Sequence, residues 1–511
     1  MTANVNSVVF NGLERTRVNV QAQISPGLPR FSIVGLADRA VKEASARIES
    51  TLAAINLSLP AKKLTVNLAP ADLEKSGSHF DLPILCAVLD AMGVLPKDAL
   101  SKYIIMGEIG LDGSILRASG VLPAGMWAEE NGLGIICPAA QGGEAKRSGN
   151  SDILAPKHIM ALINHFRGTS TLPIPEDDGG EREDKAASRP DMSEIKGQAA
   201  AKRALEIAAA GGHAMLMVGP PGAGKSMLAS RLGGILPPMT AREILQTSEI
   251  YSVAGLLGGG GLISQRPFRN VHHTASQIAL SGGGSGATPG EISLANNGVL
   301  FLDELPEFQR GTLEVLRQPM ETGGITISRA KKSATYPAEF QLIAAMNPCP
   351  CGHLGNAKLS CTKAPRCAEA YQSKISGPLM DRIDLHVEVD AVNPWDLGKI
   401  EGTEETSADV RKRTVAARER MTARSMKLFG KEILNARLDG RELEAATKLE
   451  PELRDFLNMS AEKMALSARG YNRTLRIART IADLRADDGI IMDDIAEALS
   501  YRPVNRGKFR V

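Results

Sequence analysis

The chain has 511 residues, too many for one hydrophobic core, which predicts division into about two to four domains. Its 60 Lys and Arg residues nearly balance 58 Asp and Glu residues, so any nucleic-acid binding must come from local basic patches and not from overall charge. The sequence shows neither an apolar run long enough to span a membrane nor a signal-peptide pattern, so we expect a cytoplasmic protein without membrane contact.

The first part of the chain, which we place at residues 1–169, has the pattern of a mixed α/β domain. Apolar residues alternate in the first expected strand and recur at helical spacing in the helix that follows. The expected elements are a strand over 18–24, a helix over 41–55, a strand over 64–68 and a buried helix over 80–92. Residues 170–190 combine proline, glycine and acidic residues with almost nothing apolar, which predicts an exposed linker.

A phosphate-binding loop follows the linker. The segment GPPGAGKS matches the pattern G-x-x-x-x-G-K-S, and its residues are Gly219, Pro220, Pro221, Gly222, Ala223, Gly224, Lys225 and Ser226. In such a loop backbone N–H groups surround phosphate oxygens, while Lys225 supplies a positive charge and Ser226 a hydroxyl for Mg²⁺. An apolar run over 214–218 predicts a strand before the loop, and 227–232 predict a helix after it. We therefore expect ATP or GTP to bind here.

Residues 266–298 come next and contain too much glycine for a plain helix. His272 and His273 within them lack a third metal ligand at suitable spacing, so we interpret them as hydrogen-bonded structural or channel residues.

Two apolar strands then end in polar residues. The strand over 298–302 ends at Asp303 and Glu304, where Asp303 is expected to bind Mg²⁺ and Glu304 to orient or deprotonate the attacking water. The alternative is that the two carboxylates merely cap the next helix. The strand over 340–346 ends at Asn347, whose amide is expected near the γ-phosphate. This pattern predicts hydrolysis as well as binding.

Residues 323–332 alternate like one arm of a hairpin that carries cations near its tip. These cations are Arg329, Lys331 and Lys332. Cations of this kind neutralise nucleic-acid phosphates without contacting the bases, which predicts DNA binding with little sequence preference. A solvated hairpin tip accounts for the same charges equally well.

Four cysteines follow Asn347 closely, with the spacing C-x-C-x9-C-x5-C. They are Cys349, Cys351, Cys361 and Cys367, and His353 lies among them. Four soft ligands in a short segment predict a structural zinc site, but reduced thiols without a metal fit the sequence equally well. Cys86 and Cys137 stand in apolar runs and are expected to be core residues.

Strands alternate with helices over 191–402, which predicts an α/β domain with a parallel sheet and helices on both faces. Residues 403–511 are rich in Ala, Arg, Glu and Leu and predict a helical domain. One stretch of this domain carries a series of arginines, interpreted as an exposed surface helix or a face that contacts DNA. They are Arg411, Arg413, Arg418, Arg420 and Arg424.

The order of these elements, with SGPLMDRIDLHVEV at 376–389 and YNRTLRIARTIADL at 471–484, resembles the magnesium-chelatase-like AAA+ ATPases of the ComM/YifB branch. The resemblance implies a sensor-1 role for Asn347, an arginine finger at Arg382 and a sensor-2 residue at Arg476. It also implies an adenine-binding segment that includes Ile195 and Gln198 and favours ATP over GTP, and a homo-oligomeric ring, by family usually a hexamer. An ordinary ion pair of Arg382 with Asp381 or Asp384 is the alternative.

The N-terminal segments EKSGSHFDLPIL at 74–85 and IIMGEIGLDGSILRASGVLPA at 104–124 resemble a Lon-protease-like fold. A peptidase of that type needs a serine and a lysine. Ser78 could stand in the serine position, but no lysine occurs between Lys102 and Lys146, where its partner is expected. We therefore expect a platform without proteolytic activity.

ComM-like proteins are DNA motors, so the resemblance implies an ATP-driven ring that moves along or remodels single-stranded or branched DNA. ATP and Mg²⁺ are the expected cofactors, with Zn²⁺ as a further candidate. A chelatase-type motor for metal insertion and a protein-remodelling ring are the competing hypotheses. The N-terminal domain argues against the chelatase, which ordinarily lacks it, and the missing lysine argues against intrinsic proteolysis.

Overall fold

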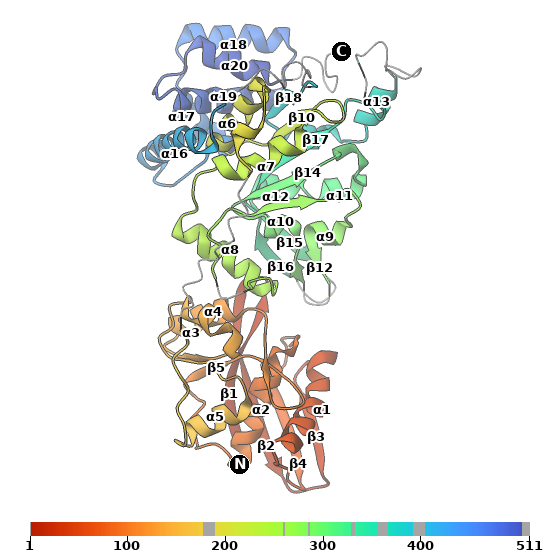
Figure 1. Ribbon diagram of the computed structural model, residues 1–511, viewed down its shortest axis with the longest axis vertical. Helices are drawn as coiled ribbons and strands as arrows, with labels where there is room; N and C mark the ends of the chain where they lie inside the picture. Colours follow the sequence, from red (N-terminus) through yellow and green to blue (C-terminus); the bar gives the residue numbers. More distant parts are fainter. Residues whose placement is uncertain are drawn as a thin grey trace.

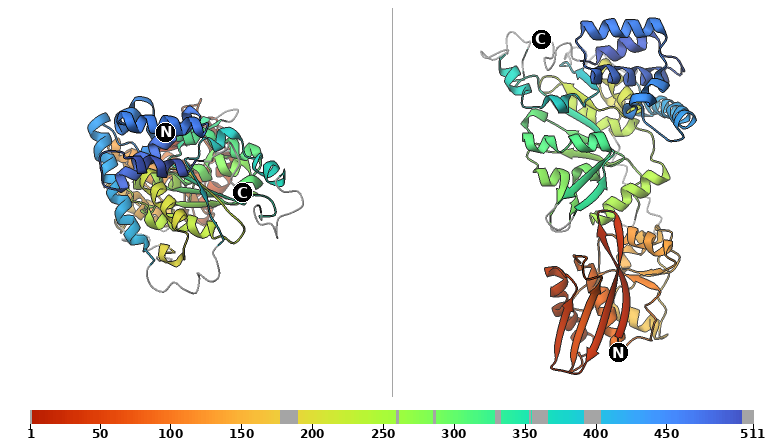
Figure 2. Two further views of the ribbon diagram at one scale, coloured as in Figure 1. Left: turned by 90° about the horizontal axis from the view of Figure 1, so that it is seen from above. Right: turned by 180° about the vertical axis from the view of Figure 1, so that it is seen from behind.

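The computed structural model describes residues 2–176, 190–258, 261–284, 287–328, 333–352, 354, 366–391 and 404–502. The molecule is elongated, with an N-terminal body at one end, a middle body built on a parallel sheet, and a C-terminal group of helices at the other end (Figure 1). The views in Figure 2 show the same arrangement. The predicted α/β class with a helical C-terminal region is confirmed. No helix among the described residues has both the length and the apolar character required to cross a membrane.

The N-terminal body is a mixed seven-stranded sheet in the order β3-β4-β2-β1-β5-β8-β9, with helices on both faces. Its strands are β1 Thr2–Asn11, β2 Glu14–Ser25, β3 Arg30–Val34, β4 Lys63–Ala69, β5 Tyr103–Ile105, β8 Gly134–Ile136 and β9 Ile153–Leu154, with the separate pair β6 Glu108–Ile109 and β7 Ile115–Leu116. Its helices are α1 Arg39–Ala54, α2 Asp81–Ala91, α3 Val121–Glu130, α4 Gly142–Lys146 and α5 Ile159–Phe166. The alternation predicted around β2 is confirmed, because Val18, Val20 and Ala22 are fully buried.

The middle body contains five parallel strands in the order β11-β14-β17-β10-β18. These strands are β10 Met215–Val218, β11 Phe268–Val271, β14 Val299–Leu302, β17 Gln341–Met346 and β18 Leu385–Glu388. The surrounding helices are α6 Ala199–Gly211, α7 Lys225–Ile235, α8 Ala241–Val253, α9 Gln277–Ser281, α10 Glu291–Leu294, α11 Arg310–Glu314, α12 Arg317–Thr322, α13 Arg366–Gln372 and α14 Gly377–Met380. Because parallel strands present their carboxyl ends at one edge, the residues that follow β10, β14 and β17 come together there.

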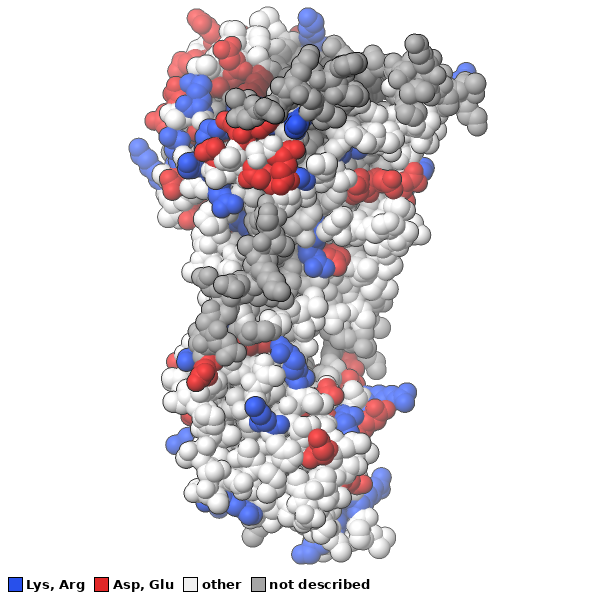
Figure 3. Space-filling model, viewed as in Figure 1, with Lys and Arg blue, Asp and Glu red and all other residues white. Residues whose placement is uncertain are grey.

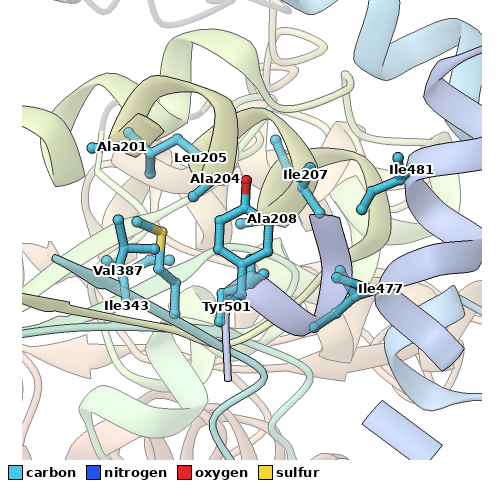
Figure 4. Packing of buried hydrophobic residues seen from close by; sticks show 14 of the residues in the cluster. Ala201, Ala204, Leu205, Ile207, Ala208, Ile343, Val387, Ile477, Ile481 and Tyr501 are labelled. Atoms are coloured by element: carbon cyan, nitrogen blue, oxygen red, sulfur yellow. The ribbon is translucent and has the colours of Figure 1, made fainter. Parts of the chain in front are cut away.

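The C-terminal helices are α16 Ser407–Phe429, α17 Gly440–Thr447, α18 Pro451–Lys463, α19 Ala468–Leu484 and α20 Met492–Ser500. They share one hydrophobic core with the sheet through α6. In Figure 4, Ala204 and Ala208 of α6 lie between sheet residues such as Ile343 and the α19 residue Ile477. A movement of α19 relative to the sheet would therefore have to break a continuous apolar core.

The arginines of α16 lie on a surface helix, as expected, but they also make contacts inside the protein. Arg413 pairs with Glu206 and Glu405, Arg418 donates to the carbonyls of Ala209 and Ala210, and Arg424 makes a bidentate pair with Asp483. Arg411 and Arg420 likewise donate to backbone carbonyls, of Gly234 and Asp483. These guanidinium groups fasten α16 to neighbouring helices, although Arg411 and Arg420 are also exposed to solvent. Contact of this face with DNA stays a prediction.

The N-terminal and middle bodies meet at α8. Leu122 of α3 packs in a buried cluster with Ile250 and Leu257, and Arg15 forms an ion pair with Glu249 in which both side chains are largely buried. The carboxylate of Glu144 accepts a 2.6 Å hydrogen bond from Ser252 across the same joint. Because polar and apolar contacts both cross this boundary, the two bodies are joined by a packed interface as well as by the chain.

The β1–β2 turn extends past α8 to the hairpin of β15 Gly324–Ser328 and β16 Ser333–Pro337. A Cβ added at Gly12 would lie 2.7 Å from the carbonyl oxygen of Thr335, so this turn abuts β16 directly. The hairpin predicted from the alternation over 323–332 is thus present, at the end of the middle body that faces the N-terminal body (Figure 1). Arg329, Lys331 and Lys332 lie outside the described residues.

A second, smaller hairpin stands beside the first. It consists of β12 Gly282–Gly283 and β13 Thr288–Pro289, within the glycine-rich segment 266–298. The Tyr336 hydroxyl of β16 donates to the Ala287 carbonyl at 2.9 Å, and a Cβ added at Gly282 would lie 2.7 Å from Cδ1 of Ile327. The two hairpins therefore pack as one unit.

Candidate nucleotide-binding site

The phosphate-binding loop lies between β10 and α7, as the strand–loop–helix pattern predicts. Gly222 and Gly224 have φ of +77° and +86°, and a Cβ at either position would meet nothing within 4 Å. Gly219 is required for a different reason, because a Cβ there would lie 2.0 Å from the carbonyl oxygen of Val389 at the end of β18. The loop thus combines left-handed turns with a close approach to the neighbouring strand, both of which need glycine.

Lys225 begins α7 and its ammonium group lies at the centre of the loop. It donates to the carbonyls of Gly219 at 2.7 Å and Pro220 at 2.9 Å, and to Oδ1 of Asn347 at 3.0 Å. Burial lowers the pKa of Lys225, while the carboxylates of Asp303 and Glu304 act in the opposite direction. The structure therefore brings Lys225 and Asn347, which are 122 positions apart in sequence, to the same point at the sheet edge.

Ser226 and Asp303 form the second contact that crosses the site. The Ser226 hydroxyl donates to Oδ2 of Asp303 at 2.6 Å, and the Glu304 N–H donates to Oδ1 of Asp303 at 2.9 Å. A hydroxyl and a carboxylate are oxygen ligands of the kind that Mg²⁺ prefers. This pair therefore fits the Mg²⁺ of a bound nucleotide.

Glu304 adopts a backbone conformation that is unusual for its residue type, with φ of 52°. A left-handed conformation in a residue other than glycine is uncommon and concentrates at functional sites. The turn separates the two side chains, so that Asp303 faces Ser226 while Glu304 lies beside His273. The predicted division of work between the two carboxylates is consistent with this geometry.

His273, interpreted from sequence as a hydrogen-bonded structural or channel residue, lies beside the site, a position that was not predicted. Its Nδ1 lies 3.3 Å from Oε2 of Glu304, and its ring is tilted by 32° against that of His272 with the centroids 4.2 Å apart. The register of β11 brings His273 to this position. Val271 pairs with Leu302, so that the residues after both strands lie side by side. His273 is thus placed to hold the Glu304 carboxylate in position.

Replacing His273 by glutamine should lower kcat a few-fold, because an ion pair between partly exposed groups is worth at most about 1 kcal/mol. The control is His272→Gln, since His272 is exposed and contacts Thr274. Steady-state ATP hydrolysis by both variants checks this, and equal rates for the two would contradict a role of His273 at Glu304.

The segment predicted to contact adenine packs next to the loop. Ile195 is buried in the same core cluster as Ala223, and Gln198 donates from Nε2 to the Asp390 carbonyl at 2.6 Å. Asp390 follows Val389, whose carbonyl contacts Gly219. Ile195 and Gln198 are therefore linked to the phosphate loop through the end of β18.

Arg382 follows α14 and pairs with Glu321 of α12. Its second contact is a 2.6 Å hydrogen bond to the Pro378 carbonyl. Both ion pairs named as alternatives are therefore wrong, because Asp384 instead contacts His213 at 3.2 Å and Arg473 at 3.4 Å. Within this single chain Arg382 does not contact the phosphate loop.

Arg476 lies on α19 and donates to the Leu438 carbonyl at 2.5 Å and to Asp439 at 3.3 Å. It likewise contacts no residue of its own phosphate loop. The structure therefore brings together six predicted residues or segments of the site but leaves Arg382 and Arg476 apart from them. Those brought together are the loop 219–226, Ile195, Gln198, Asp303, Glu304 and Asn347.

Cys349, Cys351 and Cys367 gather behind Asn347, with their sulfur atoms within 4.8 Å of one another. Cys361 and His353 lie outside the described residues. The predictions for Cys86 and Cys137 are confirmed, because both are fully buried in the cores of the N-terminal body.

Three family descriptions match successive parts of the chain. Residues 191–397 match "Magnesium chelatase, subunit ChlI", residues 20–141 match "Subunit ChlI of Mg-chelatase", and residues 404–502 match "Magnesium chelatase, subunit ChlI C-terminal". The uncharacterized protein YifB of Escherichia coli is 42% identical over 97% of this chain and 96% of its own length. The competence protein ComM of Haemophilus influenzae is 40% identical over 99% of this chain and 98% of its own length.

This chain belongs to the magnesium-chelatase-like ComM/YifB family. A chloroplastic magnesium-chelatase subunit ChlI from Nicotiana tabacum is more distant, at 27% identity over 43% of this chain. Membership supports an AAA+ ATPase that uses ATP and Mg²⁺. It adds no support for zinc.

Ser78 of the N-terminal body makes its hydrogen bond to Glu108, not to a lysine. Lys75, three positions earlier, is buried and donates to the Pro70 carbonyl. A carboxylate beside the hydroxyl and a lysine engaged elsewhere do not form a serine–lysine pair.

Proposed function

We propose that this chain is the subunit of an ATP-hydrolysing ring motor that acts on DNA. The observation that carries the ATPase part is the convergence of Lys225, Ser226, Asp303 and Asn347 at one sheet edge, with contacts of 2.6 and 3.0 Å between segments far apart in sequence. A helix-capping role for Asp303 and Glu304 does not explain the contact of Asp303 with Ser226. ATP supplies the transferred phosphoryl group and Mg²⁺ neutralises its charge.

The side chains divide the work of hydrolysis. Lys225 and the loop N–H groups bind the phosphates, Ser226 and Asp303 hold the metal ion, and Glu304 orients or deprotonates water, with His273 holding Glu304 in place. Asn347 positions Lys225 and the terminal phosphate through its amide. Arg382 acts on the nucleotide of an adjoining subunit, which accounts for its lack of contact with the loop of its own chain and requires a ring, with a hexamer as the expected size. Arg476 is the sensor-2 residue.

The DNA part of the proposal rests on the two packed hairpins. The segment between β15 and β16 contains Arg329, Lys331 and Lys332, and the hairpins share one end of the middle body. On the face shown in Figure 3, acidic and basic side chains are interspersed, and its described residues form no broad basic area. The arginines of α16 are also engaged within the protein. Local contact through the hairpins is therefore the arrangement that the charges favour.

The likeness to ComM extends over nearly the whole of both chains, whereas the likeness to the chelatase subunit covers less than half of this one. A DNA motor is therefore favoured over a motor for metal insertion. If DNA does not stimulate ATP hydrolysis, remodelling of a protein substrate becomes the favoured function.

Single-stranded or branched DNA should stimulate ATP hydrolysis several-fold, and the stimulation should fall steeply as salt rises, because phosphate contacts release counterions. Lys331→Ala should weaken this stimulation and leave hydrolysis without DNA unchanged. The control is Lys412→Ala, since Lys412 has a side chain that is 79% exposed on α16, away from the hairpins. Absence of stimulation at low salt in an active enzyme would overturn the DNA part of the proposal alone.

A further inference from the structure

Three cysteines from two separate segments converge beside the nucleotide site. Cys349 and Cys351 follow β17, Cys367 is the second residue of α13, and their sulfur atoms lie within 4.8 Å of one another. The Sγ atoms of Cys349 and Cys351 are 3.2 Å apart, and none of the three forms a disulfide. Cys349 is fully buried.

This grouping suits a thiophilic divalent ion. Tetrahedral zinc with bonds of about 2.3 Å to sulfur holds its thiolates roughly 3.8 Å apart, so the observed separations need only small side-chain rotations. Among the described residues between Asn347 and Ser376, the buried apolar ones are few, namely Cys349, Ala368, Tyr371 and Ile375. A metal ion stabilises such a segment where hydrophobic burial is limited.

The turn that carries Cys349 and Cys351 packs against the phosphate-binding loop. Gly352 has φ of +78°, its N–H donates to the Cys349 carbonyl at 2.9 Å, and a Cβ added to it would lie only 2.3 Å from Cδ of Pro221. Asn347, two residues before Cys349, accepts the hydrogen bond of Lys225. The position of this turn therefore determines the position of Pro221 in the phosphate-binding loop and of the Asn347 amide.

Helix α13, which carries Cys367, connects the same turn to the part of the chain that carries Arg382. Gln372 at the end of α13 donates to the Pro348 carbonyl at 2.9 Å, and Lys374 lies 3.5 Å from Glu307. The chain then passes directly into α14 and Arg382. An ion bound by the three thiolates would thus link the turn beside the phosphate-binding loop to helix α13, which leads to Arg382.

We propose that Cys349, Cys351 and Cys367 bind one thiophilic divalent cation, with Zn²⁺ as the expected ion, and that this ion holds the Asn347–Gly352 turn against the phosphate-binding loop and so sets the affinity for ATP. The metal site stands on the cysteines alone, and only its effect on ATP rests on the proposed function.

The metal site is tested by elemental analysis of protein purified without chelators. Wild type should contain about one zinc ion per chain or take up one from added Zn²⁺, while Cys351→Ala and Cys367→Ala should contain none and Cys137→Ala, a core cysteine of the N-terminal body, should keep it. Mass spectrometry after alkylation of wild type gives a readout without variants: Cys351 and Cys367 should react slowly until a chelator is added. A wild type that binds no zinc, a Cys351→Ala protein that keeps it, or alkylation unaffected by the chelator would overturn the site.

The link to the nucleotide site is tested by ATP binding and hydrolysis with and without the ion. Removing zinc from folded wild type should raise the KM for ATP about tenfold, the lower end of the effect expected when a supporting shell is lost, and zinc should restore it. Gly352→Ala should likewise raise KM because the new methyl group displaces Pro221, whereas Gly430→Ala, with φ of +68° and nothing within 4 Å of the added Cβ, should not. An unchanged KM in the active zinc-free enzyme would overturn the coupling, while an inactive wild type that holds zinc would instead refute the proposed function.

Discussion

Replacing Lys225 by alanine should abolish ATP hydrolysis, with a loss in kcat of at least about a hundredfold, the usual effect of removing one group that stabilises charge in the transition state. Its ammonium group lies against the Gly219 and Pro220 carbonyls and against Asn347. Alanine removes the positive charge that the phosphates need and also leaves the Asn347 amide without its partner at the sheet edge. Binding and turnover should therefore both suffer.

Steady-state kinetics and equilibrium binding of a fluorescent ATP analogue separate these two effects. Lys412→Ala is the control, because Lys412 has an exposed side chain whose ion pair among the described residues is with Asp409. A melting temperature equal to that of wild type shows that the Lys225→Ala protein is folded. If that folded protein hydrolysed ATP at a rate close to wild type, the loop would not be the catalytic site.

The nucleotide site could be predicted from sequence because each of its parts is local. The loop 219–226 carries its chemistry in eight consecutive residues, and Asp303 and Asn347 each end a short apolar strand. Parallel strands then bring such ends together without further information. The position of His273 beside Glu304 was not predicted because β11, with sequence FRNV, is short and polar and its strand character depends on pairing with β14.

The ion-pair partners that lie far away in sequence could not be predicted from the sequence. The α16 arginines lie on a surface helix as expected, but their partners were not predicted, since Glu206 and Asp483 lie 207 and 59 positions away from Arg413 and Arg424. Glu321, the partner of Arg382, is likewise 61 positions from it. The packing of the helices decides which residue pairs with a charged side chain on a helix surface. Neither the periodicity nor the local composition of the sequence predicts that packing.

The same limit applies to the joint between the N-terminal and middle bodies. The β1–β2 turn was not predicted to touch anything, yet it packs against β16 next to the segment that carries the predicted DNA-binding cations. A body fixed to α8 and to the hairpin base at once constrains how the hairpins move relative to the sheet. The N-terminal body is therefore better described as a support for the hairpins than as an appended domain.

Arg382→Ala should reduce ATP hydrolysis by about 10³- to 10⁵-fold, the range for an arginine that stabilises a transferring phosphoryl group from an adjoining subunit. Arg382 is paired with Glu321 in the single chain, so the result must be distinguished from loss of that ion pair. Glu321→Gln breaks the pair and keeps the arginine. It should leave hydrolysis within a few-fold of wild type, because an ion pair with an exposed carboxylate contributes at most about 1 kcal/mol.

Mixing two inactive proteins tests whether the arginine acts across a subunit boundary. In a ring of Lys225→Ala and Arg382→Ala chains, some interfaces pair an intact loop from the second variant with an intact arginine from the first. Such mixtures should recover part of the wild-type rate, whereas each variant alone should not. Two results would refute the shared site. One is a Glu321→Gln protein as inactive as Arg382→Ala, and the other is a mixture that co-assembles but recovers no activity. In either case Arg382 would serve its own chain as a structural ion pair.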